Sequence, residues 1–392
     1  MLAAVRRRLL LPHPLGVLAA AFSTATTTTD AAAEQAVSYL ISNCGLSAAA
    51  AARAAPSVRL ASPGAAARAD AVLALLRGRG FSDADISATV RKLPTMLSRD
   101  PAKTLQPKLE FLASVGIAAP LLPRLVSLNP ILLQRSVQDH LAPLFDSLRE
   151  VLGSNTRVAD VLRQAPFVIR CQPKSTLFRV LPLLRDVHGL SPSEVSKLIA
   201  LQPGVILQGP DRINEIVEAA RNAGVEPASP MFVYVIAILC KLKAPTLESK
   251  IALYRRLGFG EDGVTQMIRR YPGSIAISER KIEETVGFLI GKAGLSREDI
   301  VTYPTLLVRS LEAHSRRCAV VAALRRAGKR QGQHRLAVLL RCTKERFLEV
   351  YVRPHLEELP DVLRAVNGEI PFEGFDGLEE KPKQPKKKKI GA

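Results

Sequence analysis

The sequence contains no tryptophan, and only 5% of its 392 residues are aromatic. A β-sandwich, or an RNA-binding sheet that stacks bases on aromatic rings, is therefore not favoured. A hydrophobic share of 47% excludes a largely disordered chain, because such chains lack the apolar surface that offsets the entropy cost of ordering. The apolar run Met231–Cys240 is too short to span a bilayer and predicts a buried helix.

Cysteines are few and widely separated, and no two of them form a CxxC pair. We interpret them as reduced, buried or incidental thiols and not as a disulfide framework. They are Cys44, Cys171, Cys240, Cys318 and Cys342.

Acidic residues are in deficit, with 36 Asp+Glu against 55 Lys+Arg and a net charge of +19. Such an excess indicates a polyanionic partner or an anionic surface. Residues 1–29 carry three arginines and no acid, and residues 381–389 carry six lysines. Ten of the nineteen positive charges therefore fall on residues 30–380, so the folded part is expected to be basic in its own right.

The N-terminal segment, residues 1–29, has the composition of an organellar import peptide. It contains Arg6–Arg8, no acid before Asp30, and a Ser/Thr-rich end. A secretory signal is the alternative, because Leu15–Phe22 is apolar. However, Pro12 and Pro14 precede that run, and the end lacks a small-x-small cleavage site. We predict a transit peptide for the mitochondrion, with the chloroplast as the alternative.

The C-terminal segment, residues 356–392, is predicted to be an acidic and then Lys-rich disordered tail. Glu369–Glu380 is acidic and interrupted by Gly and Pro, and Lys381–Lys389 is mostly lysine. Such a composition offers no apolar face to bury. Added phosphate affinity, a mimic of a nuclear-localisation signal and a merely solvated tail all remain open as roles.

A proline flanked by apolar residues recurs along the chain at intervals of 32 to 38 residues, with one interval of 69. The positions are Pro56, Pro94, Pro130, Pro166, Pro203, Pro272 and Pro304. A glycine precedes most of them by 13 or 14 residues, at Gly80, Gly116, Gly153, Gly189 and Gly258. Gly224 keeps this spacing to Ile238, which occupies the missing proline position, so the period persists through the long interval.

Each period predicts two helices. The glycine ends one helix, and a Ser with an acid three residues later forms a capping box for the next, as in Ser82 with Asp85. The proline ends this first helix, a short turn or 3₁₀ segment follows, and a second helix completes the unit. The second helices are expected at 105–115, 141–152, 177–187, 213–223, 248–257, 282–293 and 314–326. Because no unit can bury its apolar face alone, we predict an all-α solenoid of about eight units over residues 36–328.

The iterated Gly-[Phe/Leu]-Ser…Pro-x-apolar-apolar unit, together with the segment Leu339–Val352, resembles the mitochondrial transcription termination factor (mTERF) family. The resemblance covers roughly residues 36–355, and many similar members are plant proteins. It implies a left-handed α-solenoid, here residues 30–355 with a C-terminal cap, whose basic concave side binds nucleic acid in mitochondria or chloroplasts. Ile238 and the short stretch after it depart from the family pattern.

Other helical repeats fit the sequence less well. Tetratricopeptide units carry a Trp pattern that is absent here. Pentatricopeptide units place their proline after the second helix and read RNA through fixed polar positions, which do not recur in this chain.

Basic residues recur at one position of the repeat. The fifth residue after the proline is Arg99, Arg135 or Arg309 in three units, and Arg170 lies one position earlier in a fourth. Arginines at one position of a solenoid are expected to follow a phosphate backbone. The further candidates for nucleic-acid binding are Lys174, Arg179, Lys250, Arg280, Lys281, Arg316, Arg317, Arg325, Arg326, Lys329 and Arg330. For each residue singly, a solvated face or a helix C-terminus is an alternative role.

Motifs for catalysis are weak. Gly258–Gly263 matches GxGxxG, but a helix is predicted before it where a dinucleotide-binding fold has a strand. Gly287–Ala293 lacks one spacer residue and the Ser/Thr of a phosphate-binding loop. His314 and Cys318 lie four residues apart on one predicted helix, without further metal ligands nearby. We predict no enzyme, no cofactor and no metal.

Three functions follow from this reading. The first is a monomeric, non-membrane protein that binds double-stranded DNA through its phosphates and regulates transcription, by resemblance its termination, in an organelle. Sparse aromatics favour a duplex over stacked single strands. The second is an RNA-associated factor in intron splicing or ribosome assembly, with structured RNA as its ligand. The third is a helical scaffold for acidic proteins.

Overall fold

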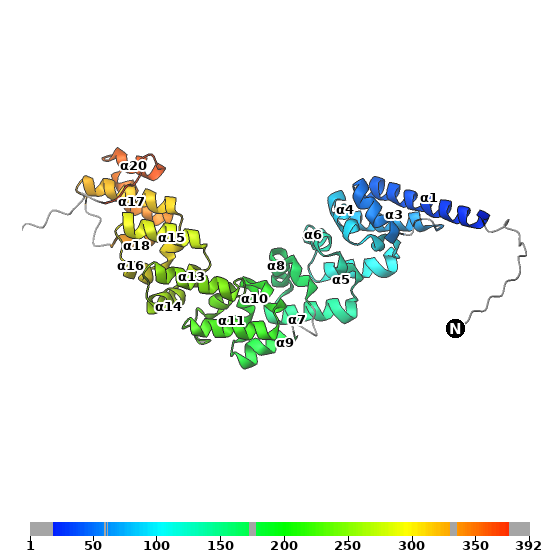
Figure 1. Ribbon diagram of the computed structural model, residues 1–392, viewed down its shortest axis with the longest axis horizontal. Helices are drawn as coiled ribbons and strands as arrows, with labels where there is room; N and C mark the ends of the chain where they lie inside the picture. The colour runs from blue at the N-terminus through cyan, green and yellow to red at the C-terminus, as the bar shows by residue number, and fades with distance from the viewer. Residues whose placement is uncertain (1–18, 59, 61, 172–177, 330–334, 376–392) are drawn as a thin grey trace, which may run out of the picture. The chain divides into compact units, whose positions relative to one another are not determined.

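The computed structural model describes residues 19–58, 60, 62–171, 178–329 and 335–375, and the side chains from residue 32 onward. Helices joined by short connections make up this part of the chain, and no strand occurs in it (Figure 1). The chain divides into two compact units, Met1–Leu177 and Phe178–Ala392. The prediction of an all-α helical-repeat solenoid is confirmed.

The first unit contains α1 to α8. Their bounds are α1 Ala19–Cys44, α2 Ala48–Ala54, α3 Ala65–Gly78, α4 Asp83–Lys92, α5 Gln106–Ser114, α6 Leu121–Leu128, α7 Ala142–Leu152 and α8 Asn155–Gln164. The 3₁₀ segments are η1 Ala55–Ser57, η2 Pro94–Ser98, η4 Pro130–Gln134 and η6 Pro166–Arg170, and the π-helical turns are η3 Pro101–Leu105 and η5 Val137–Leu141.

The second unit contains α9 to α20. Their bounds are α9 Phe178–Pro182, α10 Pro192–Leu201, α11 Pro210–Asn222, α12 Phe232–Leu239, α13 Ala244–Arg256, α14 Glu261–Arg270, α15 Glu279–Gly287, α16 Arg297–Thr302, α17 Leu311–Arg326, α18 Leu336–Arg341, α19 Lys344–Phe347 and α20 Pro360–Asn367. The 3₁₀ segments are η9 Pro203–Leu207, η10 Pro272–Ile275, η12 Pro304–Val308 and η14 Arg353–His355, and the π-helical turns are η8 Leu183–Val187, η11 Phe288–Lys292 and η13 Leu348–Val352.

The repeat prolines from Pro94 onward begin the 3₁₀ segments, as the sequence predicted for the stretch after each first helix, whereas Pro56 is the second residue of η1. Pro94 is the first residue of η2, and Pro166 is the first residue of η6. The residue before each proline that begins a 3₁₀ segment leaves the helical region, with φ −139° and ψ 65° at Leu93 and φ −133° and ψ 75° at Ala165. A proline ring disfavours helical geometry in the preceding residue, and so the first helix ends there.

Capping boxes begin several first helices, as predicted. The side chain of Ser82 accepts from the amide of Asp85, and the carboxylate of Asp85 accepts from the amide of Ser82 at 3.1 Å. Ser191 with Glu194 and Ser296 with Asp299 repeat this arrangement. The hydrogen bonds from Ser191 lower the pKa of Glu194.

The second helices begin earlier than the sequence predicted. The residue after the Arg position, or its counterpart, is a cap: Asp100, Ser136, Ser278 and Ser310 each accept from an amide three residues on. A cap side chain satisfies an otherwise unpaired amide, so each of these helices starts directly after its cap, three or four residues before the predicted start.

The unit that lacks its proline has a different connection. The apolar run forms the buried helix α12, as predicted, and Ile238 lies inside it. No 3₁₀ segment follows, and α13 starts after Lys243. No helix in the described ranges is long and apolar enough to cross a membrane.

The structured region extends past the predicted boundary at residue 356, which is a correction for residues up to 375. Helix α20 buries Val362 and Ala365, which lie three residues apart on one face, against α17. Phe372 is only 5% exposed and packs against Phe288 with ring centroids 5.9 Å apart. The apolar residues spaced through this acidic stretch therefore suffice for packing. Helix α1 crosses the predicted boundary at residues 29/30, and the Lys-rich segment lies outside the described residues.

Candidate nucleic-acid interface

The recurring arginines occupy one backbone environment. Arg99, Arg135 and Arg309 each directly follow a 3₁₀ segment and are extended, with φ from −83° to −68° and ψ from 146° to 153°. Arg170 is instead the last residue of its 3₁₀ segment, η6. The sequence periodicity thus corresponds to a shared local geometry for the first three.

In the first unit, the recurring arginines have no partner among the described residues, so their charge is free to contact a ligand. Among the described residues, no hydrogen bond or ion pair engages the guanidinium group of Arg99, Arg135 or Arg170. Arg99 and Arg170 are exposed and Arg135 is half-buried. The pKa of Lys108 is lowered, mainly by burial and then by the positive charge of Arg99. The pKa of His140 is likewise lowered by burial and then by the positive charge of Arg135. Unneutralised positive charge therefore acts on its surroundings at both sites.

Several predicted binding residues of the second unit hold the following unit in place. Their donors reach main-chain carbonyls far along the chain: Lys250 to Ile277, Lys281 to Val308 at 2.6 Å, Arg309 to Cys342 at 2.9 Å, and Arg317 to Leu340 at 2.9 Å. Three further residues that sequence reasoning did not select do the same: Lys92 to Ser127, Arg212 to Leu242 and Arg270 to Val301. We call these contacts carbonyl bridges.

The carbonyl bridges satisfy carbonyls near the ends of short helical segments, which lack partners within a regular helix. A charged donor strengthens such a hydrogen bond. These side chains therefore stabilise the stacking of neighbouring units, and an additional contact with nucleic acid stays a prediction for them.

The remaining predicted residues are mostly exposed on helices of the second unit. Arg280 is 85% exposed at its side chain and pairs with Glu284, whereas Arg179 and Arg326 are exposed and form no ion pair or hydrogen bond with the described residues. Arg316 pairs with Glu312, Lys329 pairs with Glu358, and Arg325 lies 4.4 Å from the centre of the Phe375 ring. Lys174 and Arg330 lie outside the described residues.

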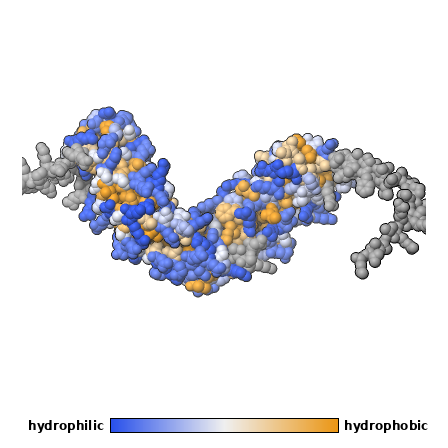
Figure 2. All heavy atoms as spheres, in the orientation of Figure 1, coloured by the Kyte–Doolittle hydropathy of each residue, from blue (hydrophilic) through white to orange (hydrophobic). Residues whose placement is uncertain are grey.

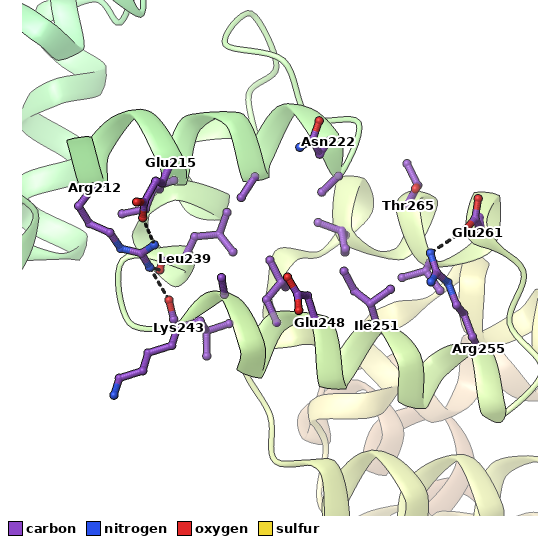
Figure 3. Close-up of a pocket in the computed structure, with 18 residues that line it drawn as sticks. Arg212, Glu215, Asn222, Leu239, Lys243, Glu248, Ile251, Arg255, Glu261 and Thr265 are labelled. Atoms are coloured by element: carbon purple, nitrogen blue, oxygen red, sulfur yellow. Dashed lines mark hydrogen bonds and ion pairs between the residues drawn. The ribbon is translucent and has the colours of Figure 1, made fainter. Parts of the chain in front are cut away.

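A groove of about 400 Å³ lies between α11, α13 and α14, where the proline is missing (Figure 3). Its charges balance, with Arg212, Lys243 and Arg255 against Glu215, Glu248 and Glu261. Both arginines of the groove form an ion pair within it, Arg212 with Glu215 and Arg255 with Glu261, as the dashed lines in Figure 3 mark. The groove therefore lacks the positive charge that a phosphate backbone requires.

The weak catalytic motifs have structural roles. Gly258 has φ +86° just after α13, and Gly260 caps α14, so both glycines serve helix ends. His314 is fully buried and bonds the carbonyl of Leu306 at 2.8 Å, and burial lowers its pKa to about 4. In the described part of the chain, no three His, Cys, Asp or Glu side chains gather as metal ligands.

The exposed surface is polar. On the face shown in Figure 2, hydrophilic side chains cover most of each unit, and apolar ones form small separate patches. This surface suits charged contacts better than a broad apolar interface.

Comparison with known proteins agrees with this fold. The family model described as mTERF matches residues 73–301 and 186–348, which together span most of the repeat array. A search of curated proteins returns no match. On the strength of these matches and of the helical repeat, the chain belongs to the mTERF family.

Proposed function

We propose that this protein binds double-stranded DNA through its phosphates and regulates transcription, including its termination, in an organelle. Proteins of the mTERF family bind nucleic acids in general. The observation that carries the proposal is the set Arg99, Arg135 and Arg170: three guanidinium groups of one unit, at or next to the same repeat position, that no hydrogen bond or ion pair engages within the described residues. Structured RNA is the alternative ligand, and the assay below distinguishes the two.

Binding to duplex DNA should depend steeply on salt. We expect the logarithm of the association constant to fall linearly with the logarithm of salt concentration between about 50 and about 200 mM, because each neutralised phosphate releases a counterion. Fluorescence anisotropy with duplex DNA, structured RNA and single-stranded DNA of equal length measures this. Tighter binding to RNA would favour the alternative, and weak, salt-insensitive binding to all three would overturn both.

Replacing Arg99, Arg135 and Arg170 together with alanine should weaken duplex binding about tenfold or more and flatten the salt slope by about two to three. The matched control replaces Arg77, Arg149 and Arg163 of the same unit. These three are exposed as well, but each pairs with an aspartate. The charge change is identical, so equal losses in both variants would show that only net charge matters and that the proposed contacts are absent.

Residues 1–29 should direct a fluorescent protein into mitochondria when fused to its N-terminus, because the segment is cationic and free of acids. Replacing Arg6, Arg7 and Arg8 with glutamine should abolish import of the fusion. Accumulation in chloroplasts would select the alternative organelle, and secretion would refute the import prediction.

A further inference from the structure

A second concave site lies at the C-terminal end of the second unit. It is a cavity of about 350 Å³ bordered by α17, α19, η13 and α20. We call it the basic pocket, because its lining contains Arg309, Arg316, Arg317 and Lys344 but only one acid, Glu312. The groove in Figure 3 differs from the basic pocket, because it is lined by equal numbers of acidic and basic side chains.

The buried charge of the basic pocket has no carboxylate partner. Arg317 is only 6% exposed, and its guanidinium group donates to the carbonyls of Leu339, Leu340 and Cys342. Arg309 donates to the same Cys342 carbonyl, so two guanidinium groups meet at one oxygen. Neither forms an ion pair within the described residues. Buried charges in proteins are usually paired, but the buried Arg317 and the half-buried Arg309 have no carboxylate partner in the described part of the chain.

The positive charges of Arg309 and Arg317 also repel each other. Burial first, and then the charge of Arg309, lower the pKa of Arg317. Glu345 and Cys342 act in the opposite direction, but Glu345 is exposed and does not line the pocket. Glu312 is already engaged by Arg316. A ligand anion would therefore meet positive charge that no side chain of the pocket neutralises.

The rim of the basic pocket carries two further basic side chains, of which Arg316 is held by Glu312 and by the carbonyl of Val366. Lys344 is exposed and has no ion pair in the described ranges, and Arg316 is exposed as well. Arg316 contacts the end of α20. Its Nη1 lies 3.4 Å from the carbonyl oxygen of Val366. Its Nε is so close to Gly368 that a Cβ atom built on this glycine would lie only 3.1 Å away. This guanidinium group thus lies against the end of α20, at the edge of the cavity.

One wall of the basic pocket is apolar. It consists of Phe347, Leu348 and Val366, and the guanidinium carbon of Arg317 lies 4.7 Å from the centre of the Phe347 ring. A cavity of this size holds a small ligand and combines a few charged groups with an apolar surface. A phosphate attached to a sugar and base matches both features, whereas an isolated inorganic anion would leave the apolar wall unused.

We propose that the basic pocket binds the phosphate of a nucleotide, supplied either by a nucleic-acid strand or by a free nucleoside monophosphate. The strand source rests on the proposed function, and the free source does not. In both cases Arg317 supplies a buried charge and Arg309 a half-buried one, Lys344 and Arg316 contact the phosphate oxygens, with Arg316 exchanging Glu312 for the phosphate, and the wall at Phe347 contacts the sugar or base.

Isothermal titration of the full chain with AMP, and with adenosine as the probe without phosphate, tests the basic pocket. We expect AMP to bind and adenosine to bind at least about tenfold more weakly, because a charge-assisted contact with phosphate is lost. The double variant Arg316→Gln and Lys344→Gln should lower the AMP affinity about tenfold or more. Circular dichroism checks that the fold is retained, as expected for two exposed side chains.

The control is the double variant Lys241→Gln and Arg269→Gln, which removes two exposed charges of the same unit outside the pocket. Equal effects of the two double variants, or equal binding of AMP and adenosine, would overturn the pocket. If a nucleic-acid strand supplies the phosphate, AMP should compete with duplex DNA, and the pocket variant should weaken duplex binding more than the control variant does. If a free nucleoside monophosphate supplies the phosphate, AMP should bind without competing with duplex DNA, and the pocket variant should weaken duplex binding no more than the control variant does.

The experiments test the basic pocket and the proposed function independently. If duplex binding is strong and salt-dependent while neither AMP nor the pocket variant has a specific effect, the pocket is refuted and the proposed function stands. If AMP binds in the predicted way while the wild-type chain does not bind nucleic acid, the proposed function is refuted and the pocket stands.

Discussion

Replacing Arg317 with methionine should lower the free energy of unfolding by about 3 kcal/mol, because it leaves buried carbonyls without their donor. Nη1 of Arg317 bonds the carbonyls of Leu339, Leu340 and Cys342, from 2.8 to 3.3 Å. These carbonyls end α18 and begin the turn before α19, where helical partners are missing. Methionine fills much of the volume but supplies no hydrogen-bond donor. Relief of the repulsion from Arg309 offsets only part of the loss.

Urea unfolding followed by circular dichroism measures this change, and hydrogen exchange of the amides in α18 and α19 locates it. The matched control is Arg316→Met on the same helix. Arg316 is exposed and its ion pair with Glu312 is at the surface, so its loss should cost less than about 1 kcal/mol. If both variants lose equal stability, the carbonyl bridge of Arg317 does not stabilise the stacking of units.

Acidification from pH 6.5 towards pH 4.5 should destabilise the second unit through His314. Burial lowers the pKa of this histidine to about 4 in the folded state from its ordinary value of 6.5. The unfolded chain therefore binds more protons between these values, and stability is complete above pH 6.5 and is lost as the pH falls towards 4. The difference amounts to about 2 kcal/mol at pH 5 and roughly 3 kcal/mol at the limit.

The variant His314→Gln should flatten this dependence, because it removes the titrating ring while retaining a donor for the carbonyl of Leu306. Thermal unfolding at several values between pH 4.5 and 6.5 provides the measurement. His140, whose pKa is also lowered by burial, should account for part of the remaining slope, and His140→Gln serves as the comparison in the first unit. Retention of the full wild-type slope in His314→Gln would contradict the assignment.

Local features of the fold were predictable because short-range interactions determine them. The capping box of Ser82 with Asp85 spans three residues, and a proline such as Pro94 restricts only its neighbour. Their recurrence along the chain predicted the period, the 3₁₀ segments and the solenoid. The starts of the second helices differ from the prediction because the caps Asp100 and Ser136 begin them four residues before the leucines at 105 and 141.

The candidate site was predictable only in part. Arg99 and Arg135 recur at one sequence position and share one backbone geometry. Lys281 and Arg317 carry the same formal charge, but they are engaged by carbonyls of a later unit. Lys344 was overlooked because no repeat position marks it.

The sequence by itself determined the helical repeat, its period and the basic character of the chain, since these follow from contacts between residues a few positions apart and from composition. Only the tertiary structure decided which positive charges remain available. The carbonyl bridges of Lys250, Lys281, Arg309 and Arg317 join residues 22 to 33 positions apart, and the basic pocket exists because α20 packs on α17. Such pairings depend on how the units stack, and a pattern within one unit does not encode them.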